Sequence, residues 1–503
     1  MKNFIPMWAF ALAFLGLVSC GGSDDVIETL PEKDKVTLND PINSFIWQGM
    51  NSWYNWKADS DKLADNKDDD LEEYYTFLNG YNDYRDLMYD LCYKHHTIVG
   101  RENAVDKDSW FIDDYEEQEK LFQGVTTSFG FRYQPVKISD TDVILYLEIV
   151  TKNSPADLAG FKRGDIINGL NGTQITADNY STVLSELSND MVTFSFIKAE
   201  NNELTQLDDK TISRAENVDE PVNLYKIFND IGGKKVGYLV YTGFRFSYHS
   251  ELNEVFAFFK SEGIDELVLD LRFNGGGTVI TSAYLSSMIY GAGGTQDYAE
   301  IRYNQNHTEE NYTYTFEDKM FILDADANIQ GEENINRLSK LNNLYVLVSD
   351  GSASASEMLI NGLKPYMSFV KLIGTTTYGK NVGSITLYDS PSSDFQNKPL
   401  NKDHKFAMQP IVFQSYNSVG ESDFGNGFSP DIEVKEWYYW DDIKPLGDEN
   451  EVLLKTALDD IRGVVSKVAP GKDQTEVELL KFESKEDRFA KELYLVPDFK
   501  RLK

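Results

Sequence analysis

Residues 346–363, VLVSDGSASASEMLINGL, pass from a β-branched apolar run through small residues into a helical pattern. The pattern predicts a strand that ends at Ser349, a tight turn, and a helix that starts near Ser354. At a helix N-terminus, free backbone N–H groups and the positive end of the helix dipole can stabilise an oxyanion. The residues SASE, from Ser354 to Glu357, are also typical of a capping box, and on local sequence alone the cap is the favoured interpretation.

A serine nucleophile needs a base within hydrogen-bond reach. None of the five histidines lies in a recognisable catalytic context. A lysine can replace histidine where burial lowers its pKa toward neutrality. Lys380, in VKLIGTTTYGKNVGS (370–384), follows a buried-looking strand and a Tyr-Gly turn, 26 residues after Ser354. A lysine in a loop is ordinarily only solvated, so the neighbouring motifs decide whether Lys380 is the base.

The region around these motifs, residues 223–440, alternates apolar strands with helical segments and predicts an α/β domain. The glycine run after its second strand, taken by itself, predicts only a tight turn. The predicted strands are KKVGYLVYTGF (234–244), DELVLDLRF (265–273), LYVLVS (344–349) and VKLIGTT (370–376).

Four other segments differ in composition from this domain, so the chain is predicted to be a multidomain α/β protein. Residues 41–120 are aromatic and acidic with helical periodicity, and predict a small helical domain. Residues 121–200 contain alternating strands and predict a β-rich domain. Residues 201–222 are polar and predict a connector, and residues 441–503 predict a helical C-terminal extension.

Length and charge limit the classes of function. A chain of 503 residues exceeds what one hydrophobic core usually supports, so roughly two to four domains are expected. The net charge of −34 would repel phosphates, which argues against a nucleic-acid partner. The acidic run DNKDDDLEE (65–73) lacks the glycine and the ligand spacing of an EF-hand loop. We therefore predict no metal and no cofactor; the sequence does not predict the oligomeric state.

The N-terminus, MKNFIPMWAFALAFLGLVSCGGSDD, has one early lysine, an apolar core of about 16 residues and small residues before Cys20. It predicts an export signal that is too short for a comfortable membrane span. Residues 1–20 resemble a bacterial lipoprotein signal, in which Cys20 is lipidated; an ordinary signal peptide is the alternative. Residues 21–40 would form a tether, and GGSDD resembles the acidic export tag of some Bacteroidetes lipoproteins. We expect a lipid-anchored protein of the cell envelope, on the periplasmic face or the cell surface.

The segments VGYLVYTGF, LVLDLRFNGGG, VLVSDGSASASE and LIGTTTYGKNVGS, in this order, resemble the C-terminal processing peptidases, also called tail-specific proteases. The resemblance implies a serine endopeptidase with a crotonase-like α/β core and a Ser-Lys dyad. Ser354 would be the nucleophile and Lys380 the general base. The backbone N–H of Ala355 would form one half of the oxyanion hole. The glycine turn would supply the other half, with Gly277 as the best candidate and Gly276 as the near alternative, because a substrate carbonyl must approach bare backbone there.

One position departs from the family pattern. Four residues after the lysine, the family commonly has glutamine or a similar polar residue that orients the lysine, whereas this chain has Ser384. The serine hydroxyl is shorter, so either water or another residue would have to orient Lys380.

The segment SPADLAGFKRGDII (154–167) resembles a PDZ domain. SFGFRY (128–133) then falls at the carboxylate-binding loop of such domains. Phe129, Gly130 and Phe131 are expected to hold the C-terminus of a protein substrate while the neighbouring strand edge pairs with the peptide. A small β-domain that packs on its neighbour and binds nothing is the alternative.

The predicted function is therefore hydrolysis of peptide bonds in protein substrates through an acyl-enzyme on Ser354. The alternative is a surface lipoprotein with an eroded active site that binds peptides through its PDZ-like domain, and the departure at Ser384 is its only support. A third possibility keeps the same dyad but acts on esters. Any contact with a membrane is expected through the N-terminal lipid only.

Overall fold

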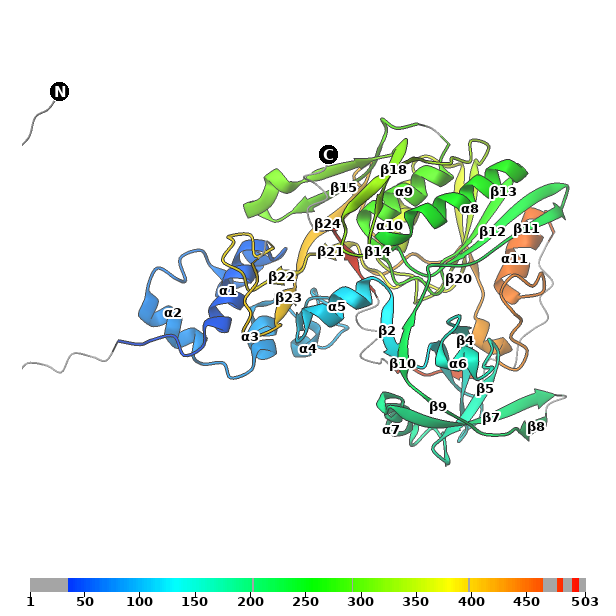
Figure 1. Cartoon of the computed structure of the whole chain (residues 1–503), viewed down its shortest axis with the longest axis horizontal. Coiled ribbons are helices and arrows are strands. Elements are labelled where there is room, and N and C mark those ends of the chain that lie inside the picture. The colour runs from blue at the N-terminus through cyan, green and yellow to red at the C-terminus, as the bar shows by residue number, and fades with distance from the viewer. Residues whose placement is uncertain are drawn as a thin grey trace, which may run out of the picture.

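The computed structural model describes residues 35–200, 203–291, 293–396, 399–464, 477–482 and 491–496. The predicted signal peptide with Cys20 and most of the predicted tether lie outside these residues. Of the described helices, none combines the length and the apolar character that crossing a bilayer requires. The described residues form a helical N-terminal part, a β-rich domain and an α/β core (Figure 1).

The helical part contains α1 (Pro41–Trp53), α2 (Leu71–Leu78), α3 (Tyr84–Leu91), α4 (His96–Val99) and α5 (Tyr115–Phe122). An aspartate side chain accepts a backbone N–H at the start of α1, α2, α3 and α5, so these starts follow from N-capping. The acidic run before α2 ends at such a cap, Asp70. Strand β1 (Trp110–Ile112) pairs antiparallel with β23 (Ala407–Gln409), which attaches the helical part to the core.

The β-rich domain is an antiparallel sheet around a core of phenylalanine side chains. Phe161 and Phe194 are buried there, with ring centroids 5.5 Å apart in an edge-to-face contact. Helices α6 (Pro155–Leu158) and α7 (Tyr180–Leu184) connect its strands. The strands are β3 (Phe131–Lys137), β4 (Val143–Val150), β5 (Ile166–Leu170), β6 (Thr173–Gln174), β7 (Met191–Glu200), β8 (Glu203–Gln206) and β9 (Lys210–Ser213).

The prediction of a polar connector over residues 201–222 is wrong for the residues described there. Strands β8 and β9 both pair with β7. Strand β10 (Ala215–Val218) pairs with β2 (Val125–Ser128). All four residues of β8 are exposed. An edge strand with both faces in solvent needs no apolar alternation, so its sequence gives no strand pattern.

The α/β core is built on a six-stranded sheet with the order β11 (Val222–Ile231), β12 (Lys234–Tyr241), β13 (Glu266–Asp270), β19 (Asn343–Val348), β20 (Phe369–Gly374) and β25 (Ile432–Glu433). Strand β11 is antiparallel to β12, and the remaining neighbours are parallel. Helices cover both faces, so the central strands are buried and read as continuous apolar runs. On one face lie α8 (His249–Glu262), α9 (Val279–Ile289) and α10 (Ala355–Leu363), and on the other lies α11 (Val452–Ile461) (Figure 1).

A second, mixed sheet of the core lies beside the first. Its order is β14 (Gly277–Thr278), β27 (Leu493–Tyr494), β21 (Val382–Ser384), β24 (Ile411–Asn417), β15 (Asp297–Tyr303) and β16 (Tyr312–Thr315). Strand β22 (Leu387–Tyr388) extends the β1–β23 pair, and β17 (Lys319–Leu323) forms a hairpin with β18 (Ile329–Asn334).

The prediction of a helical extension over residues 441–503 is only partly right. The helix α11 lies there, but the described residues after it include β27 and a further strand, β26 (Glu478–Leu479). Each strand has two residues and pairs with strands far earlier in the chain. Two residues show no periodicity, so these strands could not be predicted locally.

Candidate active site

Ser354 ends the turn between β19 and α10, residues 349–354, which we call the nucleophile turn. Its φ of 63° and ψ of −112° lie where residues other than glycine are seldom found. The side chain is fully buried, and Oγ has no hydrogen-bond partner among the described residues. Such backbone strain clusters at functional sites, and an unbonded buried hydroxyl costs free energy unless a ligand supplies the partner.

Glu357 ties the nucleophile turn to the loop that carries Lys380. As in the predicted capping box, its carboxylate accepts the backbone N–H of Ser354, at 2.9 Å. The same carboxylate accepts the backbone N–H groups of Gly379 and Lys380, each at 2.8 Å. Burial raises the pKa of Glu357, and hydrogen bonds from Thr377 and from the backbone oppose that shift. Glu357 therefore fixes the two predicted dyad residues relative to one another.

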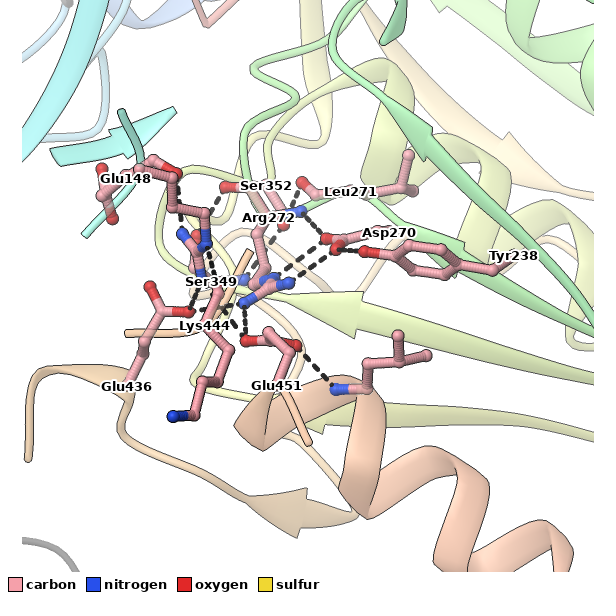
Figure 2. Close-up of polar contacts among 12 residues, drawn as sticks. Glu148, Tyr238, Asp270, Leu271, Arg272, Ser349, Ser352, Glu436, Lys444 and Glu451 are labelled. Atoms are coloured by element: carbon pink, nitrogen blue, oxygen red, sulfur yellow. Dashed lines mark hydrogen bonds and ion pairs between the residues drawn. The ribbon is translucent and has the colours of Figure 1, made fainter. Parts of the chain in front are cut away.

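The other three serines of the opening stretch have structural roles. Their hydroxyls donate to carbonyl groups of the chain that follows β13, so they hold the nucleophile turn and the start of α10 against that chain. Figure 2 shows the contacts of Ser349 and Ser352. The pairs are Ser349 with Arg272 and Ser352 with Leu271, both at 2.7 Å, and Ser356 with Asn274, at 2.9 Å.

A buried ionic network lies next to this contact and surrounds the guanidinium of Arg272 (Figure 2). The guanidinium contacts the carboxylates of Asp270 at 2.7 Å, Glu436 at 2.7 Å and Glu451 at 2.8 Å. Arg163 of the β-rich domain reaches Glu451 at 3.3 Å. Buried charges persist when they are paired in this way. The network fixes the end of β13 and joins the β-rich domain to the core.

The glycine turn, residues 274–277, follows directly. Gly276 and Gly277 have φ of 115° and 138°, which favour glycine. The N–H of Gly276 donates to Asn274 Oδ1 at 2.9 Å, whereas the N–H of Gly277 donates to the carbonyl oxygen of Glu492 at 2.5 Å. A Cβ added at Gly276 would lie 2.4 Å from that oxygen, 2.7 Å from Ser354 Cβ and 3.0 Å from the nitrogen of Ala355. The structure therefore brings Ser354, Ala355 and the glycine turn together around one carbonyl group.

Lys380 lies in the same site with its side chain fully buried. Its Nζ donates to Glu492 Oε1 at 2.8 Å and to the carbonyl of Lys491 at 2.9 Å. The ring centroid of Trp110, from β1 of the helical part, is 6.0 Å from Nζ. Within the described residues no hydrogen bond joins Nζ to Ser354 Oγ. The proton donors of Lys380 are instead directed at the C-terminal segment.

Ser384 also contacts that segment, and a glutamine accompanies it. Ser384 Oγ donates to Glu492 Oε2 at 2.9 Å and accepts from Gln409 Nε2 at 2.9 Å. Burial raises the pKa of Glu492 to about 8, and Lys380 opposes the shift. Sequence reasoning missed both Gln409 and Glu492. No local motif marks either residue, and only the pairing of β23 and β27 brings them to the site.

The predicted peptide-binding loop lies in the β-rich domain. Phe129 is buried in its apolar core, and Phe131 begins β3. Gly130 has φ of 83°, and a Cβ there would lie 2.1 Å from Ser154 Cβ, so packing alone requires glycine. The next residue, Arg132, donates to the carbonyl of Phe273, which links β3 to the chain before the glycine turn.

Four of the five histidines form hydrogen bonds with residues other than Ser354, which agrees with the expectation that the base is not a histidine. Among the described residues, no group of three or more His, Cys, Asp or Glu side chains is arranged to hold a metal ion. The histidine contacts are His95 with Ser109, His249 with Thr281, His307 with Ser52 and His404 with Asp389.

Comparisons with known proteins agree with this geometry. Residues 235–434 match the model of peptidase family S41. The chain is 26% identical over 267 residues to carboxyl-terminal-processing peptidase 1, chloroplastic, of Arabidopsis thaliana, covering 53% of this chain and 50% of that protein. It is 23% identical over 335 residues to the carboxy-terminal processing protease CtpA of Bacillus subtilis (strain 168), covering 66% and 65%. The chain thus spans half to about two thirds of the length of these curated relatives.

A solved structure is also similar. The crystal structure of a candidate S41 protease from Bacteroides fragilis NCTC 9343 has a TM-score of 0.63 and 27% sequence identity, and the match covers 84% of this chain and 98% of that one. The multidomain α/β fold is therefore similar to that of an S41 protease structure. Together, these similarities show that residues 235–434 resemble peptidase family S41, and they support a serine-type peptidase.

Proposed function

We propose that the protein is a serine endopeptidase that hydrolyses peptide bonds of protein substrates with a Ser354–Lys380 dyad. One observation carries the proposal: the strained, buried Ser354 has an unbonded Oγ and lies beside the glycine turn at Gly276, and Glu357 holds both Ser354 and Lys380 by their backbone. A nucleophile, a base and oxyanion donors on rigid elements are what acyl transfer needs.

The chemistry follows from these groups. Neutral Lys380 takes the proton of Ser354 Oγ as Oγ attacks the substrate carbonyl carbon. The N–H groups of Gly277 and Ala355 stabilise the oxyanion. Gly277 suits this task better than Gly276, because its N–H already donates to a carbonyl oxygen, that of Glu492, whereas the N–H of Gly276 donates to Asn274 within the glycine turn. The lysinium then protonates the leaving amine as the C–N bond breaks, and water hydrolyses the acyl-enzyme by the reverse proton transfers.

Gln409 supplies a long polar side chain at Ser384, the position where this chain departs from the family pattern. Ser384 and Gln409 form a buried hydrogen-bonded pair, and Ser384 and Lys380 both bind the carboxyl group of Glu492. We propose that this pair orients Lys380 in place of the longer side chain of the family. The eroded-site alternative then loses its only support, and the similarity to processing proteases does not favour it.

We also propose that the core is crotonase-like and that the β-rich domain is a PDZ domain that receives substrate C-termini at Phe129, Gly130 and Phe131. The link from Arg132 to Phe273 supports communication between that loop and the glycine turn. Export of the chain and lipidation of Cys20 belong to the same proposal, with the protein anchored in the cell envelope.

Replacing Lys380 by methionine tests the proposed function. The variant keeps the apolar stem and removes the base, so the rate of cleavage of a denatured protein should fall by about 10²- to 10⁴-fold. Lys57→Met is the matched control, because Lys57 is also a buried, ion-paired lysine but lies in the helical part. Mass spectrometry of new peptide termini measures cleavage by both variants. Equal cleavage by wild type and Lys380→Met would contradict the dyad, and a parallel ester assay separates peptidase from esterase activity.

A further inference from the structure

The C-terminal strand β27 lies between β14, which begins at Gly277, and β21, which begins two residues after Lys380. It pairs in parallel with β14, where Gly277 is opposite Leu493, and with β21, where Ser384 is opposite Tyr494. The red end of the chain is seen beside β14 and β21 in Figure 1. A peptide bound by strand addition is likewise extended and held by backbone pairing.

The carbonyl of Glu492 lies where the proposed mechanism needs the carbonyl of a substrate. Its oxygen accepts the N–H of Gly277, the proposed oxyanion donor, at 2.5 Å. The same oxygen lies on the side of Gly276 that faces Ser354 and Ala355. The segment therefore lies in the cleft as a substrate would.

The side chain of Glu492 differs from that of a productive substrate in one respect: it binds the proposed base, Lys380. Its carboxylate binds Lys380 and Ser384, and the carbonyl of Lys491 takes a second hydrogen bond from Lys380 Nζ. Both side chains of the ion pair are buried. Because Nζ is directed at these two groups and not at Ser354 Oγ, which is unbonded, Lys380 is not placed to accept the proton of Ser354 in this arrangement.

A second contact of the C-terminal region falls at the other proposed substrate site. Strand β26 pairs antiparallel with the end of β3, and the N–H of Leu480 donates to the carbonyl of Pro135 at 3.0 Å. Leu480 and Phe482 pack against the apolar core of the β-rich domain, which includes Phe129. The chain's own C-terminal region therefore occupies the edge of β3 as well as the catalytic cleft.

We propose that residues 491–496 are a built-in inhibitory segment, in which β27 fills the substrate cleft and Glu492 holds Lys380, so that full activity requires the segment to leave. The inference rests on the proposed peptidase function and adds its regulation. Removal of the segment exposes Ser354, the oxyanion donors and the base together. A protein substrate and the segment then compete for one cleft, and the apparent affinity for substrate falls with the fraction of molecules that are closed.

The variant Glu492→Gln tests this inference in the full chain. It keeps the shape of the side chain but replaces the carboxyl group that binds both Lys380 and Ser384 by an amide, so the initial rate on a quenched fluorescent peptide should rise at least about tenfold over wild type. Glu203→Gln, which removes an exposed carboxylate from β8, should leave the rate unchanged. Where wild type cleaves the peptide measurably, a rate for Glu492→Gln equal to or below that of wild type would overturn the inference.

A binding measurement tests whether residues 491–496 fill the substrate site, and it does not depend on catalysis. The probe is a fluorescent peptide of residues 491–496, Lys-Glu-Leu-Tyr-Leu-Val, and the receptor is the full-length Ser354→Ala protein, either with or without Glu492→Gln. By fluorescence anisotropy, the form with Glu492→Gln should bind the peptide at least about tenfold more tightly, because its own segment leaves the site more often. Equal binding, or none by either form, overturns the inference. If binding follows the expectation but wild type and Glu492→Gln both cleave nothing, the proposed function fails while the occupied cleft stands.

Discussion

Replacing Ser354 by alanine is expected to lower kcat/KM for a denatured protein substrate by at least about 10³-fold. The variant removes only Oγ, which has no hydrogen bond to lose, so the fold should be unaffected. The loss follows because no acyl-enzyme can form, while the oxyanion donors and the binding surface remain. Initial rates measured with the same substrate preparation give the ratio directly.

Ser356→Ala is the matched control for this variant. Ser356 is two residues away, equally buried, and its hydroxyl only holds the nucleophile turn to Asn274. Its loss should cost about 0.5–1.5 kcal/mol of stability and leave most of the activity. If Ser354→Ala kept full activity and Ser356→Ala lost it, Ser354 would not be the nucleophile.

Replacing Arg272 by alanine is expected to lower the free energy of unfolding by about 3–5 kcal/mol, because the variant leaves buried carboxylates without their shared cation. Asp270, Glu436 and Glu451 all contact this guanidinium, at 2.7 to 2.8 Å (Figure 2). Urea unfolding followed by circular dichroism measures the loss.

The exposed pair Lys319–Glu332, on the β17–β18 hairpin, supplies the control. Lys319 Nζ lies 3.1 Å from Glu332 Oε2, but both side chains are largely in solvent. Lys319→Ala should therefore cost less than about 1 kcal/mol. If the two variants lose equal stability, the ionic network does not hold the core as the structure indicates.

The parts of the site that follow from local sequence were predictable, and the parts that depend on distant pairing were not. Ser354 and Lys380 each lie in a motif that joins a buried strand to a turn. The structure places Ser354 beside the glycine turn and links Lys380 to that turn through Glu492. Glu357 was assigned to a cap, and the structure adds that it holds the loop of Lys380. Gln409 and Glu492 come from short strands whose neighbours lie far away in the chain, so no spacing could connect them to the lysine.

The same distinction holds for the fold. The strands of the parallel sheet are buried on both faces and read as apolar runs, so their positions were clear. The strands β8, β9 and β10 are polar and lie at sheet edges, so they were mistaken for a connector. The strands β26 and β27 are too short for a period of two to show.

The most direct test of the central claim, that Ser354 is a nucleophile activated by Lys380, is covalent labelling. The Glu492→Gln protein is incubated with a fluorophosphonate and digested, and the modified residue is located by mass spectrometry. We expect one adduct, on Ser354. This adduct should be absent from the double variant that carries both Glu492→Gln and Lys380→Met. An adduct on another serine, or labelling of Ser354 that persists without Lys380, would contradict it.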